Sequence, residues 1–376
     1  MKIAYIITWN LRHNDGVTRK VFRQVQEWQE LGHEVEIFCA TELEGQVLPR
    51  VHFFFKRRIW SSGLFGVFFN RRAYARLCES VRSFTPDIVY LRWEFHKNAL
   101  ADLMKNVPTV IELNTHFLGE FKRRARENWI ERLRYWYYKL THKKFNEVCS
   151  GFVSVSKEIL EKGGYEQLGK PTCYIPNSIP IDHSNDPVSY VAKPNSIPRL
   201  VFISSGIQPW HGLENLLQLA EASKGELEFD LITGFDADET ILPENVRFHA
   251  FLERDEFLNV FEGVVAGIGS AGLYENEMEE ASVLKVREYL AAGLPVIVPY
   301  TDTAFMDDDL PDWILQVPNE PGSLLASKQK ISDFVKVMNG RRIPLQEVSP
   351  YVGSERWETQ RVDFMESVLV SSSESV

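Results

Sequence analysis

The sequence predicts two α/β domains, each built on a parallel β-sheet of the Rossmann type. Short apolar runs alternate with amphipathic stretches through the first half of the chain, which is typical of βαβ units. The alternation stops at a segment rich in Pro, Asn and Ser, residues 175–198, and then starts again. A length of 376 residues also exceeds what a single ordinary core accommodates.

The first series is opened by the buried strand expected at residues 2–8, and residues 17–32 then read as a helix that ends at Gly32. Further strands are expected at residues 33–40, 87–93, 109–114 and 151–156. The second series places strands at residues 199–205, 227–234, 246–252, 263–270 and 295–300. We therefore expect an N-terminal domain over 1–180, a C-terminal domain over 181–355, and a last helix over 356–370.

Charge is distributed unevenly along the chain. Residues 1–180 carry 28 Lys and Arg against 19 Asp and Glu, a net of +9, and the other residues carry 14 against 33, a net of −19. A basic first half is thus joined to an acidic second half, and the overall net charge of −10 hides this asymmetry.

Cysteine usage and hydropathy point to the cytoplasm. The four cysteines show no zinc-ligand spacing, so we expect them to be reduced and mostly buried. The N-terminus lacks the long apolar stretch of a signal peptide, and the sequence has no run of 18 apolar residues that could span a membrane.

The segment 280–298 carries the chemistry. It predicts a helix that begins near Ser282 or Val283 and ends at Gly293, just before a strand. The free amides and the positive dipole of such a helix start would suit a diphosphate, and Lys285 in the first turn could neutralise phosphate oxygens. Glu280 would lie just before the helix, near a donor sugar, and Glu288 two turns along could accept hydrogen bonds from ribose hydroxyls.

These residues resemble the donor motif of the family 4 retaining glycosyltransferases, which have the GT-B fold. The family motif is two glutamates with seven residues between them, here Glu280 and Glu288, then a helix that ends in Gly-x-Pro-Val. The chain resembles the subtype S-x-L-K-x-x-E-Y-x-A-A-G-x-P-V, here residues 282–296, in which the second glutamate is Glu288. Weaker similarities follow one another along the chain in the same order as in the family. They lie at residues 14–21, 32–38, 174–179, 205–217 and 355–360. The resemblance implies two Rossmann-like domains that face a central cleft and a C-terminal helix that crosses back to the first domain.

The resemblance also implies roles for individual residues. Glu280 would hold donor-sugar hydroxyls, and Glu288 the ribose. The remaining donor contacts would be Lys285 and the amides of Ser282, Val283 and Leu284 on the diphosphate, Gly16 in the first loop, Gly206 and His211 in the second-domain loop, and Leu252 near the base. A histidine that touches the donor sugar in this family has two possible equivalents here, Asn114 and His116, at the carboxyl end of one strand.

Two features depart from the family pattern or compete with it. The family's basic pair in the second-domain loop is missing its first cation, because Ile207 stands there, and His211 replaces the second. Residues 267–272 match GxGxxG, but they follow a late strand and precede an acidic segment, so NAD binding is not expected. A small-residue loop that lets the donor approach is the better interpretation.

Two segments of the first half combine cations with aromatic residues. Residues 55–76 have six basic residues and no acids, and residues 117–145 have nine basic residues against three acids. Such segments suit an anionic membrane surface, which suggests an enzyme peripheral on the inner face of the plasma membrane and a lipid-linked acceptor. A solvated helix face with buried aromatics is the alternative, and nucleic-acid binding is disfavoured by the acidic second half.

Retention of configuration in this family is usually drawn as attack on the same face from which the diphosphate departs. That needs positioning and electrostatic stabilisation rather than a covalent nucleophile, and we expect no metal and no cofactor beyond the nucleotide sugar. The sequence leaves open which nucleotide, sugar and acceptor are used. Two other functions remain possible, a nucleotide-sugar epimerase or phosphorylase of similar fold, and a non-catalytic partner-binding subunit.

Overall fold

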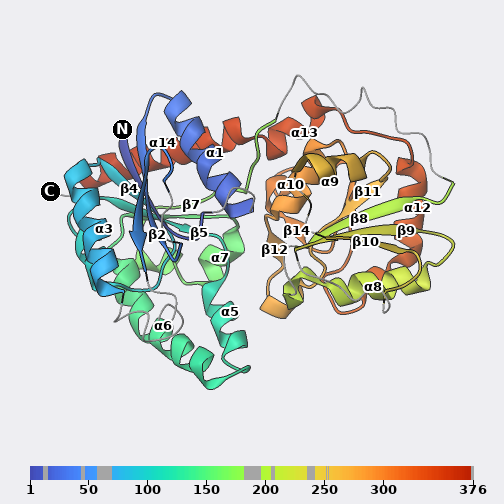
Figure 1. The fold of residues 1–376 in the computed structure, drawn as a ribbon, viewed down its shortest axis with the longest axis horizontal. Coiled ribbons are helices and arrows are strands. Elements are labelled where there is room, and N and C mark those ends of the chain that lie inside the picture. Colours follow the sequence, from blue (N-terminus) through green and yellow to red (C-terminus); the bar gives the residue numbers. More distant parts are fainter. Residues whose placement is uncertain are drawn as a thin grey trace. The chain divides into compact units, whose positions relative to one another are not determined.

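The computed structural model describes residues 1–11, 16–43, 47–56, 70–181, 196–204, 208–234, 242–250, 252 and 254–373. These residues form two compact units (Figure 1). The first comprises residues 1–175 and 355–376, and the second comprises residues 176–354. The predicted fold class is confirmed, because each unit is built on its own parallel sheet.

The first unit contains a seven-stranded parallel sheet in the order β3-β2-β1-β4-β5-β6-β7. Its strands are β1 Lys2–Thr8, β2 Glu34–Thr41, β3 Val51–Phe55, β4 Ile88–Arg92, β5 Thr109–Leu113, β6 Gly151–Ser154 and β7 Thr172–Tyr174. Its helices are α1 Gly16–Glu30, α3 Arg71–Phe84, α4 Asn98–Met104, α5 Phe117–Arg124, α6 Trp129–Glu147, α7 Lys157–Lys162, the 3₁₀ helix η2 Glu166–Leu168, and all but the first residue of α14 Ser354–Ser373. Strand order reverses between β1 and β4, so ligands are expected at the carboxyl ends of these strands.

Local sequence explains the first βα unit. Five consecutive residues of β1 are buried, as expected for a strand covered on both faces. Helix α1 buries Val21, Val25 and Trp28, spaced four and three residues apart on one face. The helix ends before Gly32, whose φ of 89° lies in the left-handed region that glycine adopts without strain.

The last helix, α14, packs on the first unit. It contributes Trp357, Met365 and Val368 to the same hydrophobic cluster as Trp28 of α1, and the two helices lie side by side in Figure 1. The predicted return of the C-terminal helix to the first domain is therefore confirmed.

The second unit contains a six-stranded parallel sheet in the order β10-β9-β8-β11-β13-β15 and a small two-stranded sheet, β12-β14. Its strands are β8 Arg199–Ser204, β9 Glu228–Thr233, β10 Val246–His249, β11 Ala266–Ile268, β12 Glu280–Ala281, β13 Val296–Val298, β14 Thr301–Asp302 and β15 Ile314–Gln316. Its helices are η4 Pro209–His211, α8 Leu213–Ala222, α9 Arg254–Phe261, η6 Leu273–Asn276, α10 Leu284–Ala291, η7 Thr303–Phe305, α11 Ser323–Ala326, α12 Lys328–Met338 and α13 Leu345–Val352. Here strand order reverses between β8 and β11, which marks the carboxyl end of β8 as the expected ligand site.

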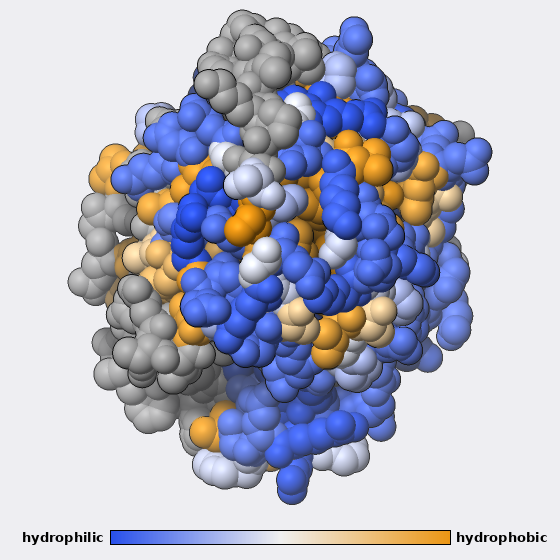
Figure 2. Space-filling model, turned by 90° about the vertical axis from the view of Figure 1, so that its right-hand side faces the viewer, coloured by the Kyte–Doolittle hydropathy of each residue, from blue (hydrophilic) through white to orange (hydrophobic). Residues whose placement is uncertain are grey.

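The remaining general features concern surface and redox state. The face drawn in Figure 2 is largely hydrophilic, with hydrophobic side chains in small separate patches. All four cysteines are free, and three of them are buried, as the sequence predicted. Among the described residues, none of the helices combines the length and the apolar character needed to cross a bilayer.

Candidate functional site

The amino end of α10 offers a seat for an anion in the second unit. The helix begins at Leu284, and Val283 occupies its N-cap position without any side-chain hydrogen bond to the first turn. The first amides of a helix have no partner inside it, and a valine cannot accept a hydrogen bond from them. These amides and the positive end of the helix dipole therefore favour a negatively charged group.

Lys285 adds a buried cation to this helix start. Its Nζ is buried without a hydrogen-bond partner in the described part of the chain, and it lies 4.1 Å from the centroid of the Phe202 ring. Burial lowers the pKa of Lys285 from 10.5 to about 7. Because this buried ammonium has no hydrogen-bonded partner among the described residues, it is poorly compensated, and an incoming phosphate would supply an anion.

His211 reaches the same strand as Lys285. Its Nδ1 lies 2.7 Å from Oγ of Ser204, the last residue of β8. Side chains two residues apart on a strand leave the same face of the sheet, so Phe202 and Ser204 bring Lys285 and His211 to neighbouring positions. The predicted donor residue Gly206 and Ile207, which replaces the first cation of the family's basic pair, lie outside the described residues.

The two glutamates of the motif flank the helix start. Glu280 is half-buried in β12, which pairs with β14 and precedes α10 by two residues. Glu288 is half-buried in the second turn of α10. Leu252, expected near a base, packs against the hydrophobic core of the second unit.

A buried network behind the helix start was not predicted. Arg287 is fully buried and makes a bidentate pair with Asp302, with N···O distances of 2.6 and 2.8 Å. It also donates to Oγ of Ser282 at 2.9 Å and to the carbonyl of Asn177 at 2.8 Å. Asn177 in turn donates its backbone amide to Ser282 Oγ at 2.7 Å.

This network fixes Ser282 immediately before α10, so it holds the predicted amides of Ser282, Val283 and Leu284 in place. Arg287 itself was the sequence feature that could have indicated this network. An arginine between the buried residues Val286 and Tyr289 needs a carboxylate partner. The sequence alone does not say that Asp302 is that partner.

The glycines of the 267–272 motif are explained by packing within the second unit. A Cβ on Gly267 would lie 2.2 Å from the ring of Tyr289, and one on Gly269 would lie 2.8 Å from the hydroxyl of Tyr300. A Cβ on Gly272 would lie 2.3 Å from the carbonyl oxygen of Pro209. Close approach of protein groups therefore already accounts for these glycines, and the interpretation of this stretch as a loop kept small for the donor is not needed.

In the first unit, the predicted residues gather at the carboxyl ends of β1 and β5. Gly16 is the first residue of α1, which follows β1, and the adjacent residues 12–15 lie outside the described part of the chain. Asn114 directly follows β5, and its Oδ1 accepts from Lys20 Nζ at 3.0 Å. His116 occupies the N-cap position of α5 and is half-buried.

Lys20 also pairs with Glu112, at 2.8 Å. Glu112 is fully buried, and Arg92 at 3.3 Å and Arg361 of α14 at 3.8 Å face it as well. Although burial opposes ionisation, Lys20 and Arg92 hold the pKa of Glu112 well below its ordinary value. Glu112 is thus the centre of a structural charge cluster that supports Asn114.

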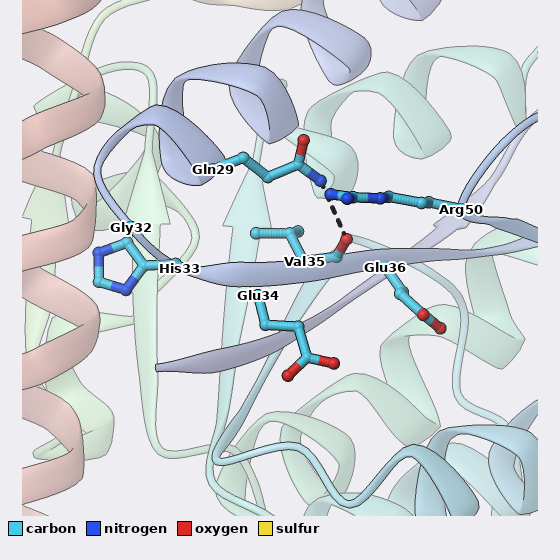
Figure 3. Close-up of a pocket in the computed structure, with 7 residues that line it drawn as sticks. All are labelled: Gln29, Gly32, His33, Glu34, Val35, Glu36 and Arg50. Carbon is cyan, nitrogen blue, oxygen red and sulfur yellow. Dashed lines mark hydrogen bonds between the residues drawn. The ribbon is translucent and has the colours of Figure 1, made fainter.

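A surface pocket elsewhere in the first unit carries no candidate chemistry. It lies beside the amino end of β2 and is lined by Gln29, Gly32, His33, Glu34, Val35, Glu36 and Arg50 (Figure 3). Ligands of doubly wound sheets bind at the opposite, carboxyl end of the strands. Among the described residues, no group of three or more His, Cys, Asp or Glu side chains is placed to hold a metal ion.

Part of the chain is similar to a known protein family. Residues 14–183, most of the first unit, match the family model described as Glycosyltransferase Family 4. This part of the chain is therefore similar to a glycosyltransferase family 4 domain. No curated protein sequence matches the chain.

Solved structures match both units of the chain at once. The lipopolysaccharide outer core galactosyltransferase WaaB has 11% identity and a TM-score of 0.65, with 98% of this chain and 99% of that chain covered. A sucrose-phosphate synthase from Thermosynechococcus elongatus has 14% identity and a TM-score of 0.68, with 98% and 99% covered. An α-glucosyltransferase in complex with UDP and DNA has 12% identity and a TM-score of 0.61, with 97% and 100% covered. The chain therefore has the GT-B glycosyltransferase fold.

Proposed function

We propose that the chain is a retaining glycosyltransferase that moves a sugar from a nucleotide sugar to a glycan or a lipid-linked acceptor in the synthesis of a surface polysaccharide or glycoconjugate. The observation that carries the proposal is the buried ammonium of Lys285 at the uncapped start of α10. A diphosphate would satisfy the free amides and the cation together, which no neutral ligand does.

Each predicted residue has a part in this proposal. Glu280 holds hydroxyls of the donor sugar, and Glu288 holds the ribose. Lys285, with the amides of Ser282, Val283 and Leu284, holds the diphosphate. The lesser contacts are Gly16 and Gly206 at loops that approach the phosphates, His211 beside the diphosphate, Leu252 near the base, and Asn114 or His116 at the donor sugar.

Retention follows in this scheme from attack on the face that the diphosphate leaves. The bond between the anomeric carbon and the diphosphate oxygen breaks, and the acceptor oxygen forms the new bond to that carbon. The acceptor proton passes to the departing diphosphate oxygen. Amides and Lys285 stabilise the growing negative charge, so we propose that transfer needs neither a metal nor a cofactor besides the donor.

The structural neighbours suggest where to look for the substrates. The α-glucosyltransferase was captured with UDP, and WaaB is named as a galactosyltransferase of the lipopolysaccharide outer core. We therefore propose a UDP-sugar as the first donor to test and a cell-surface glycan or its lipid-linked precursor as the acceptor. We also propose that transfer takes place at the cytoplasmic face of a membrane, where the basic residues of 1–180 would be attracted to anionic lipid.

Donor binding and turnover test the proposal. Calorimetry with UDP-, GDP- and ADP-sugars should reveal one nucleotide class that binds, and Glu280→Ala should lower the rate of sugar transfer or donor hydrolysis at least 100-fold. Glu320→Ala, which removes an exposed acid of the same unit, is the matched control and should keep full activity. Failure of every nucleotide sugar to bind would overturn the proposal.

A folded wild type that binds a nucleotide sugar but transfers nothing to any acceptor would point to the non-catalytic subunit instead. Interconversion of the donor sugar in the absence of acceptor would point to an epimerase. Product analysis with and without acceptor therefore separates the three functions.

A further inference from the structure

Helix α6 exposes a line of large apolar side chains on its outer face. Trp129, Leu133, Trp136 and Leu140 are spaced by four, three and four residues, which places them in one row along the helix. Trp129 is 64% exposed, Trp136 50% and Leu140 73%, and Leu133 is exposed as well. A row of this kind about 16 Å long is not a scatter of single surface hydrophobics.

The opposite face of α6 is anchored to the first unit, so this row is not a misplaced core face. Tyr138 is buried there, with its ring centroid 5.4 Å from that of Phe121 in α5 and 5.8 Å from that of Trp93 after β4. The hydroxyl of Tyr137 donates to the carbonyl of His96 at 2.9 Å. The helix therefore presents its outer face on a fixed support.

Cations flank the apolar row on both sides. The exposed charged residues of α6, every residue of which the structure describes, are Arg132, Lys139, Lys143, Lys144 and Glu147. Four of these five are basic, and the single acid is the last residue of the helix. Lys139 Nζ lies 5.4 Å from the Trp136 ring, so aromatic and cationic groups occupy the same stretch of surface.

We infer that the outer face of α6 docks on an anionic phospholipid bilayer. Tryptophan and leucine side chains enter the boundary between headgroups and acyl chains, and lysine or arginine side chains beside them contact lipid phosphates. A symmetric contact between two copies of this face would place the same cations against each other, which disfavours a dimer. This inference identifies the helix by which the proposed glycosyltransferase would contact the membrane. It rests on the proposed function only in that docking would bring a lipid-linked acceptor within reach.

The segment 117–145, predicted from composition to touch a membrane, contains nearly all of α6, and the apolar row now identifies which residues would do so. Most of the other predicted segment, 55–76, lies outside the described residues. Among the described residues, the structure therefore supports α6 as the docking element.

Vesicle co-sedimentation of the full chain tests the inference. The wild type should bind vesicles that contain phosphatidylglycerol and should bind phosphatidylcholine vesicles much more weakly. The double variant Trp136→Ser/Leu140→Ser should weaken binding at least tenfold. The matched control Leu325→Ser/Val337→Ser, which removes two exposed apolar side chains from the second unit, should leave binding unchanged.

Charge reversal gives an independent test. Each basic residue near an anionic surface contributes about fivefold to binding, so Lys139→Glu/Lys143→Glu should weaken it by about 25-fold or more. The control Lys330→Glu/Lys336→Glu on α12 should weaken it much less. These side chains are exposed, so circular dichroism should show all four variants folded.

The inference is overturned if the wild type ignores anionic vesicles, or if the α6 variants bind them as well as the controls do. The inference also fails if the wild type does not bind vesicles but instead forms a concentration-dependent dimer or binds duplex DNA, and the α6 variants abolish that interaction. The face would then belong to another partner. Nucleotide-sugar binding, measured in parallel, distinguishes these failures from failure of the proposed function.

Discussion

Lys20 Nζ lies 2.8 Å from Oε1 of Glu112, and both side chains are buried. The pair joins α1, which follows the first loop, to β5, whose carboxyl end carries Asn114. Since an ammonium group only donates hydrogen bonds, its contact with Asn114 orients the Oδ1 of that amide toward Lys20. The Nδ2 group of Asn114, which has no partner among the described residues, is thereby kept available as a donor.

We predict that Lys20→Met destabilises the first unit by about 3–5 kcal/mol, because it leaves Glu112 buried with less compensation. The double variant Lys20→Met/Glu112→Gln should recover part of that loss, since the uncompensated charge is removed as well. Urea denaturation of the single and double variants measures both effects. Lys105→Met, which removes an exposed lysine of the same unit, should change stability by less than about 0.5 kcal/mol. Equal losses in the single and double variants would contradict the explanation.

The fold and the start of α10, the helix of the proposed donor site, could be predicted from local sequence. Near-continuous apolar runs identified the buried strands, and the helix expected to begin near Ser282 or Val283 begins at Leu284. The glycine at the end of that helix, Gly293, has a φ of 70°, which explains why the pattern Gly-Leu-Pro marks its end. These features depend on residues that are neighbours along the chain, and they can therefore be predicted from the sequence.

The supporting contacts could not be predicted, because they join residues far apart in the sequence. Arg287 contacts Asn177, 110 positions earlier, and Lys20 contacts Glu112, 92 positions later. Nor does the sequence show that Lys285 packs on the Phe202 ring and is buried there, and it is this burial that lowers its pKa. Charge pairing in the interior is decided by tertiary packing rather than by spacing.

The Arg287–Asp302 pair should be far more important for stability than its exposed counterpart in the same unit. Asp302→Asn leaves the fully buried guanidinium with less compensation, and we expect a loss of about 3–5 kcal/mol. Arg341 and Asp312 form a similar bidentate pair at 2.7 and 3.1 Å, but solvent reaches both side chains. Asp312→Asn should therefore cost no more than about 1 kcal/mol. Thermal unfolding of the two variants provides the comparison, and comparable losses would refute the role given to burial.

Gly267 should tolerate no side chain. An added Cβ would lie 2.2 Å from the Tyr289 ring, which is fully buried in α10 and cannot move aside without disturbing that helix. We expect Gly267→Ala to destabilise the protein by about 1–3 kcal/mol and to weaken nucleotide-sugar binding. Gly263→Ala is the control, because the three atoms nearest to its added Cβ all belong to the guanidinium end of Arg199, a flexible group. Unchanged stability in Gly267→Ala would show that α10 can shift without cost.

Donor binding should depend on pH through Lys285. In the free protein its pKa is lowered to about 7 by burial, and a bound diphosphate should raise that pKa. Between the two values the complex holds a proton that the free protein lacks, so binding takes up a proton in this window. Affinity should accordingly be highest below pH 7 and should fall as the pH rises above it, by at most tenfold per pH unit.

Calorimetry with a nucleotide sugar in buffers of different ionisation enthalpy measures this proton uptake directly. A nucleotide sugar is the better probe, because its diphosphate, unlike that of a free nucleoside diphosphate, has no group that titrates near neutral pH. Lys285→Met should weaken binding, abolish the proton uptake and raise the melting temperature of the free protein, since a poorly compensated cation is removed from the interior. Lys330→Met, at an exposed position of the same unit, should behave as the wild type. Proton uptake that persists in Lys285→Met would assign the titration to another group and would leave Lys285 without the role in diphosphate binding that its burial suggests.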